Sequence, residues 1–87
     1  MNKNVNVIAE LSRKNDMLRL VEELHMISPI SRVIISPMVE PTDDKLFQAV
    51  VESQDASVTL HFKDIGVART IAKVIRADTG ADVIMRF

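Results

Sequence analysis

Two histidines and a small number of carboxylates are the side chains of this sequence that could support metal binding or acid–base chemistry. Glu22 and His25 stand three positions apart, a spacing that di-metal carboxylate sites use on helices, but those sites need a second such pair and further carboxylates. We therefore interpret Glu22 and His25 as a pair on a helix surface. His61 has no neighbouring motif that would orient it, and we interpret it as an outward-facing residue of a strand.

An acidic segment and the absence of cysteine limit the possible chemistry further. Glu40, Asp43 and Asp44 could approach a hard cation, but the segment lacks the alternating ligands and the glycine of a calcium loop, so we interpret it as a solvated turn. Without cysteine there are no disulfides, thiolate metal sites or cysteine nucleophiles. The sequence also lacks a phosphate-binding glycine loop and a nucleophile elbow. It predicts no catalytic residue, no metal and no cofactor, and hence a protein that is not an enzyme.

Four basic residues form the second group whose spacing could do chemistry. Arg69, Lys73 and Arg76 follow i, i+4, i+7 spacing, which places them on one face of a helix, and Lys63 precedes that helix. Such a stripe can follow the phosphates of a nucleic acid. The alternative is a solvated helix face whose later cations favour the helix dipole. Because the formal net charge is −1, any binding of nucleic acid must be local.

The composition is that of a small globular protein. Of 87 residues, 47% are hydrophobic and 26% are charged, which excludes a disordered or membrane-spanning chain and leaves room for one domain, residues 1–87. No apolar run near the start resembles a signal peptide, and we expect a cytoplasmic protein. Tyrosine and tryptophan are absent and only three phenylalanines occur, which weakens any interpretation based on stacking of nucleic-acid bases.

The first third of the chain predicts a strand followed by a helix. Residues 5–11 alternate between apolar and more polar side chains, a period of two that is typical of a strand with one buried face. Apolar residues then recur at helical spacing over 17–27. Ser12 or Asn15 could cap this helix, and Pro29 ends it.

The middle of the chain predicts strands, with one ambiguous segment. Residues 32–39 are β-branched and apolar enough for a strand, and Pro37 places its end at an edge or a bulge. Residues 46–53 fit either a helix capped by Thr42 or a strand. We favour the strand, because residues 58–62 alternate cleanly and a polar stretch between the two segments suits a hairpin.

The last third predicts a second helix and a final strand. Asp64 is placed to cap a helix that carries Ala68, Ile71, Ala72 and Ile75 on its apolar face, and Gly80 stands where a left-handed residue would end it. Residues 83–87 then form the last strand. The order β-α-β-β-β-α-β predicts an α+β, ferredoxin-like two-layer sandwich with a mostly antiparallel sheet and two helices on one face.

The strands carry more apolar residues than one buried face needs. If the odd-numbered positions of the first two strands face the helices, the opposite face carries a surplus of apolar residues, which can form a patch large enough to serve as an interface. The alternative is that the middle segment is helical, or packs back and covers this face. The predicted contact residues are Ile8, Ile34, Leu46, Val50 and Ile84, with Met38 nearby and with His61 and Arg86 as polar contacts.

These observations favour a small accessory or regulatory protein, such as an inhibitor of a larger enzyme or complex, that acts by protein–protein contact and forms a homodimer. Binding of RNA through Lys63 and the helix stripe is one alternative. A second alternative is a small-molecule sensor or enzyme subunit in which His61 or Glu22 becomes functional only across the two-fold axis of a dimer.

Overall fold

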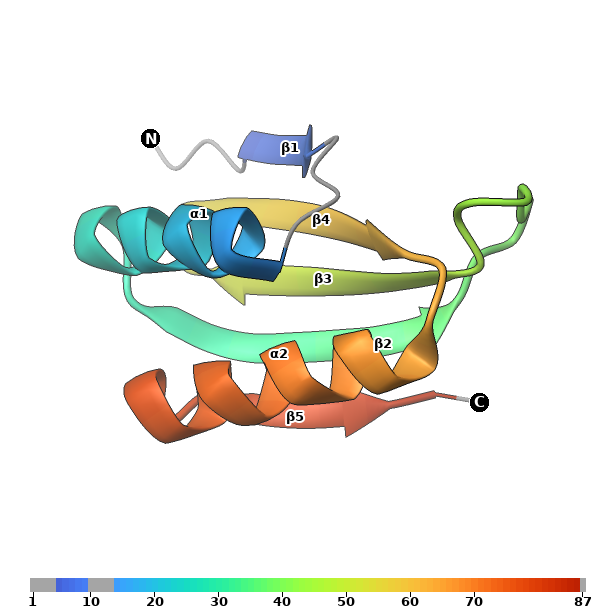
Figure 1. Ribbon diagram of the computed structural model, residues 1–87. Helices are drawn as coiled ribbons and strands as arrows, with labels where there is room; N and C mark the ends of the chain where they lie inside the picture. The colour runs from blue at the N-terminus through green and yellow to red at the C-terminus, as the bar shows by residue number, and fades with distance from the viewer. Residues whose placement is uncertain (1–4, 10–13, 87) are drawn as a thin grey trace.

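The computed structural model describes residues 5–9 and 14–86, and for residues 5–9 and Lys14 it describes the backbone alone. The described elements follow the predicted order β-α-β-β-β-α-β (Figure 1). They are β1 (Val5–Ala9), α1 (Lys14–Ile27), β2 (Ile30–Pro37), β3 (Phe47–Ser53), β4 (Ala56–Phe62), α2 (Ile65–Thr79) and β5 (Asp82–Met85).

The strands form one mixed sheet in the order β1-β4-β3-β2-β5. β3 runs antiparallel to both of its neighbours, whereas β1 pairs with β4 and β5 pairs with β2 in parallel. The protein is therefore α+β, with two helices in its described part. The mostly antiparallel, ferredoxin-like arrangement is not confirmed, because each helical connection carries the chain past two strands and sets the next strand parallel to the one before it.

Both helices cover the same face of the sheet, as predicted, and they also contact each other (Figure 1). Val33 and Ile35 of β2 are 0% exposed beneath them, and the buried positions on β3 alternate in the same way. On β4, Val58, Leu60 and Phe62 are buried on this face, and Thr59 on the other face is buried as well. From the helices, the apolar residues of the core include Met17, Val21, Leu24, Ala68, Ile71, Ala72 and Ile75. Neither helix has the length and apolar character needed to span a membrane.

The ends of α2 follow the predicted cap residues. The Asp64 carboxylate accepts a 2.8 Å hydrogen bond from the Gly66 N–H, and Gly80 has a left-handed φ of 73° while its N–H donates to the Arg76 carbonyl. At the other helix the prediction was less accurate. α1 begins at Lys14, so Asn15 lies inside it and is not the cap, and Ser12 lies outside the described residues.

The ambiguous segment 46–53 is a strand from Phe47, so the helical alternative is wrong. A tight turn joins it to β4, in which the Ser53 hydroxyl donates to the Ala56 carbonyl and accepts from the Ala56 N–H. The connection from β2 to β3 continues the hairpin beyond the sheet, since the Met38 N–H donates to the Leu46 carbonyl at 3.0 Å. This connection projects from the body of the protein (Figure 1).

Candidate functional site

Backbone register brings one residue from every strand into a single row across the sheet. Ile34 of β2 pairs with Val50 of β3 and with Ile84 of β5, and the pairing continues through Thr59 of β4 to Ile8 of β1. We call these five residues the Ile34 row. Four of its five members, all except Thr59, were predicted as apolar contact residues of the sheet face, but only the backbone of Ile8 belongs to the described structure.

The Ile34 row lies on the face of the sheet that the helices leave open. Val33 and Ile35 point into the core, and since side chains alternate along a strand, Ile34 points to the other side. Ile34, Val50 and Ile84 are each half-buried. They are therefore neither sealed inside the protein nor fully exposed, and they retain apolar surface that a partner could cover.

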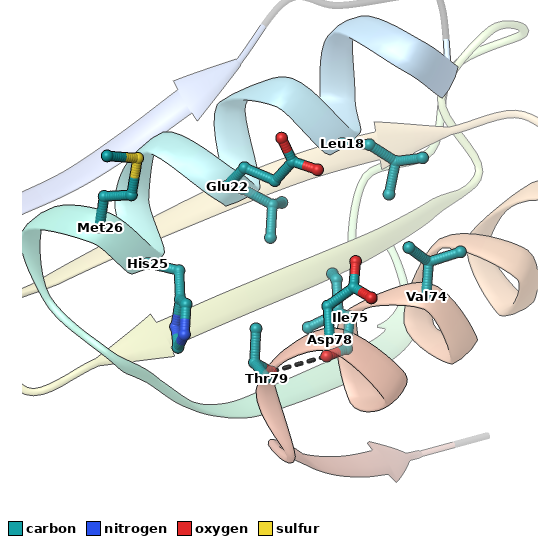
Figure 2. A pocket seen from close by; sticks show the side chains of 9 residues that line it. Leu18, Glu22, His25, Met26, Val74, Ile75, Asp78 and Thr79 are labelled. Atoms are coloured by element: carbon teal, nitrogen blue, oxygen red, sulfur yellow. Dashed lines mark hydrogen bonds between the residues drawn. The ribbon is translucent and has the colours of Figure 1, made fainter.

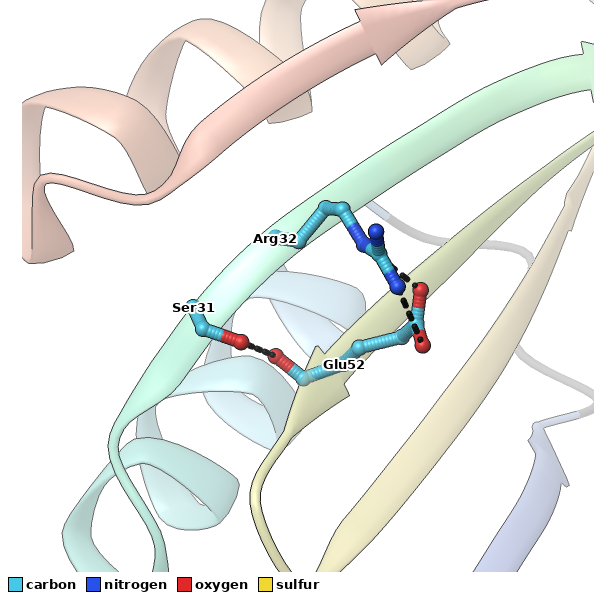
Figure 3. Close-up of polar contacts among 3 residues, drawn as sticks. All are labelled: Ser31, Arg32 and Glu52. Carbon is cyan, nitrogen blue, oxygen red and sulfur yellow. Dashed lines mark hydrogen bonds and ion pairs between the residues drawn. The ribbon is translucent and has the colours of Figure 1, made fainter.

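A polar row borders the Ile34 row on one side. Arg32 donates two hydrogen bonds to the Glu52 carboxylate, at 3.0 and 3.2 Å, and the Ser31 hydroxyl donates to the Glu52 carbonyl (Figure 3). The paired Arg32 and Glu52 largely neutralise each other. Asp82 pairs with Arg32 in the backbone register and is exposed, so its negative charge remains on this side.

A second polar row borders the Ile34 row on the other side. It contains Ser36, Gln48 and His61, in which the Gln48 amide donates to the Ser36 hydroxyl at 3.5 Å. Beside it, the Arg86 N–H donates to the Ile35 carbonyl and continues the pairing of β5 with β2, and the Arg86 side chain is exposed. Among the described residues Arg86 forms no ion pair, so it adds a positive charge on this side.

Leu46 and Met38 lie apart from the Ile34 row. Leu46 directly precedes β3, donates its N–H to the Phe62 carbonyl and is 38% exposed, while Met38 is half-buried. The row of Gln48 stands between them and Val50. The sequence predicted one continuous apolar face. The structure instead has three apolar side chains, Ile34, Val50 and Ile84, between two polar rows, and a separate apolar pair at the end of the hairpin.

His61 is less outward than the sequence interpretation implied. The side chain is half-buried, and its Nδ1 atom is buried without a hydrogen-bond partner among the described residues. In this orientation Nδ1 cannot be reached by another molecule. The ring edge of His61 that carries Nδ1 therefore packs against other atoms of the protein.

The basic stripe predicted on the second helix is exposed. Arg69, Lys73 and Arg76 lie on the solvent side of α2, and Lys63 precedes its cap residue. None of the four forms an ion pair with another described residue. All four cationic groups are therefore available to an anionic partner.

Glu22 and His25 line a groove between α1 and α2 (Figure 2). His25 Nδ1 accepts a 3.0 Å hydrogen bond from the Ile30 N–H, and this bond fixes the ring where the chain leaves α1 for β2. The groove has a volume of about 280 Å³. Its lining residues are Leu18, Val21, Glu22, His25, Met26, Val74, Ile75, Asp78 and Thr79.

Comparisons with known proteins give no assignment. No family model matches this sequence, and no curated protein or solved structure shows a significant match to it. Within the described residues, no three histidine or carboxylate side chains lie together in a way that could hold a metal ion.

The sequence interpretation missed the groove and the position of Asp82 beside the Ile34 row. Leu18, Glu22 and Met26 repeat at intervals of four, as do Val74 and Asp78, and each series forms a stripe along one side of its helix. These repeats were a usable signal for a shared surface. That the two stripes face each other depends on how the helices pack, which no local pattern reports.

Proposed function

We propose that this protein is a small accessory or regulatory protein that acts through the open face of its sheet, and that it binds a second copy of itself there. The observation that supports this proposal is the Ile34 row, in which the half-buried apolar side chains of Ile34, Val50 and Ile84 are bordered by polar rows. An apolar centre with a polar rim is the usual anatomy of a protein–protein interface.

The charges beside the Ile34 row favour a second copy as the partner. Asp82 and Arg86 are both on the β5 side of the sheet, one on each flank of the row. A two-fold axis along the row would stack two open faces with their strands in opposite directions. The Ile34 row of one copy would then cover that of the other, and each Asp82 would face an Arg86.

The size of the face suits a dimer that forms reversibly. Five strands, spaced by about 4.8 Å and about six residues long, cover on the order of 450 Å². Two copies would bury about 900 Å² in total, just below the roughly 1,000 Å² expected of a specific interface. The same face would then be free in the monomer to bind a regulated protein, such as an enzyme that it inhibits.

Charge reversal on both flanks tests the arrangement of the dimer. Asp82→Arg and Arg86→Asp should each raise the dimer dissociation constant by about tenfold, because each sets like charges against each other. The double variant should recover an affinity within about threefold of the original, since it restores opposite charges. Sedimentation velocity over a concentration series measures all four constants. A double variant that dimerises no better than the single variants would contradict this arrangement.

A charged substitution within the Ile34 row tests whether this face is the dimer interface. Ile34→Asp should abolish dimerisation, because a carboxylate would be buried against apolar side chains of the second copy. Arg69→Glu on the far side of the protein is the matched control and should leave the dissociation constant unchanged. Circular dichroism establishes that both variants are folded. An unchanged constant in folded Ile34→Asp would exclude this face as the interface.

Binding of RNA is a second candidate function, favoured by the exposed and unpaired cations of the α2 stripe. Affinity for a single-stranded RNA should then fall with salt, with a log–log slope of about −2 to −3 for three or four phosphate contacts. Reversal of Arg69, Lys73 and Arg76 to glutamate should remove that binding. An affinity that does not change with salt, or no binding at low salt, would eliminate this candidate.

A further inference from the structure

The groove between α1 and α2 has a floor and walls made of hydrocarbon. Leu18 and Val21 contribute from α1, and Val74 and Ile75 from α2 (Figure 2). Val21 and Ile75 belong to the core, whereas Leu18 and Val74 are only half-buried. At the outer end, Met26 is 87% exposed, and its flexible side chain can adapt to an occupant. The groove would thus accept a small apolar body.

The mouth of the groove carries negative charge from both helices. Glu22 of α1 and Asp78 of α2 are exposed and stand on opposite sides of it (Figure 2). Neither carboxylate forms an ion pair or a hydrogen bond with another described residue. Two unpaired carboxylates across an apolar groove raise the local affinity for a cation.

The remaining polar groups of the groove add no positive charge. His25 accepts from the Ile30 N–H through Nδ1, which only an uncharged ring can do. The Thr79 hydroxyl donates to the Ile75 carbonyl at 2.6 Å and accepts from the Ala81 N–H at 3.2 Å, so it is already occupied within the helix end. Among the described residues that line the groove, no charged donor is therefore available for an anion.

We propose that this groove is a binding site for a small organic cation that carries an ammonium group on an apolar body. The hydrocarbon part would occupy the space between Leu18 and Val74, and the ammonium group would lie between Glu22 and Asp78. A volume of about 280 Å³ suits a ligand smaller than a typical drug molecule. The site is on the opposite side of the sheet from the Ile34 row and does not depend on the interface proposed above.

A matched series of probes tests the charge requirement. Hexylammonium, 1-hexanol and hexanoate have the same chain and differ in the charge of the head group. Nuclear magnetic resonance titration of the methyl groups of Leu18 and Val74 should show hexylammonium binding about tenfold more tightly than 1-hexanol, and hexanoate more weakly than either. Equal affinity for all three probes, no binding of hexylammonium, or shifts confined to residues elsewhere would overturn the proposal.

Variants then separate the charge from the cavity. Glu22→Gln combined with Asp78→Asn should remove the tenfold preference for hexylammonium over 1-hexanol while both still bind. Glu23→Gln, which changes an exposed carboxylate of α1 outside the groove lining, is the control and should retain the preference. Val74→Trp should fill the groove and weaken both probes by at least about tenfold. Full retention of the preference in the folded double variant would refute the assigned role of the carboxylates.

Discussion

At the scale of single residues, Asp64 and Gly80 fix the two ends of α2 by different means. Asp64 supplies an acceptor for the Gly66 N–H, one of the groups that a helix leaves unpaired at its start. Gly80 adopts a left-handed backbone conformation, with φ 73°, that is unfavourable for most other residues. Because α2 carries both the basic stripe and one wall of the groove, these ends determine where those groups stand.

Gly80→Ala should destabilise the protein by about 1 kcal/mol, because a Cβ atom strains the left-handed backbone. No atom lies within 4 Å of the added Cβ, so the cost arises from the backbone and not from a clash. Gly80→Asn should cost less, since asparagine tolerates this conformation. Urea unfolding of both variants measures the difference. Equal losses in the two variants would contradict the backbone explanation.

The cap residues of α2 were predictable because their signals are local. Asp64 and Gly80 act within a few residues of their own positions, and the sequence predicted both correctly. His25 shows the limit of such reasoning. Its hydrogen bond to the Ile30 N–H joins the end of α1 to the start of β2, and the sequence offered only its spacing from Glu22, which indicated a surface pair. Predicting the hydrogen bond between His25 and Ile30 would have required the geometry of the connection between α1 and β2.

At the scale of elements, consecutive residues of β2 contribute to opposite faces of the sheet. Ile35 is fully buried beneath the helices, whereas Ile34 beside it lies on the open face and is half-buried. Two isoleucines that are adjacent on one strand therefore have different roles. Packing against the helices stabilises the fold, and the open face remains available for contact with another molecule.

Ile35→Ala should lower the free energy of unfolding by about 2–5 kcal/mol, the range for a truncation that leaves a cavity in a core. Ile34→Ala should cost about 1 kcal/mol, because water already reaches part of the side chain. Urea unfolding at a low protein concentration, where the monomer dominates, compares the two variants. Similar losses would mean that the open face is as tightly packed as the core.

The existence of the strands could be predicted, but not their partners. Alternation of apolar residues located β3 correctly in a segment that also fitted a helix. It also separated Ile34 from Ile35. It did not reveal that Ile84 would lie beside Ile34, because a parallel pair is formed by residues far apart in the sequence. The Ile34 row was therefore predicted residue by residue and not as a row.

At the scale of the whole molecule, the sheet formed by the described residues has three inner strands and two edge strands. β4, β3 and β2 each have a neighbour on both sides, whereas β1 and β5 have one neighbour each. The helices cover one face, and the Ile34 row crosses the other. The two sites proposed for this protein lie on opposite sides, so that occupation of one leaves the other accessible.

Amide hydrogen exchange should be slower in the inner strands than in the edge strands. The amide of Val51, at the centre of the sheet, should exchange only on global unfolding. The amide of Arg86, which donates to the Ile35 carbonyl at the β5 edge, should exchange at least about tenfold faster through local opening. Exchange measured at low protein concentration, followed by nuclear magnetic resonance, gives both rates. Equal protection of the two amides would show that the edge opens only together with the centre.

The parallel pairing of β1 with β4 also affects the order of events during synthesis. The residues that pair with β1 are made about fifty residues after it, so β1 is synthesised well before its neighbour exists. The hairpins of β2, β3 and β4 can form first, because their contacts are close in the sequence. In a nascent chain that stops before residue 56, β1 has no strand to pair with. In a longer chain, β4 is an unprotected sheet edge until β1 pairs with it.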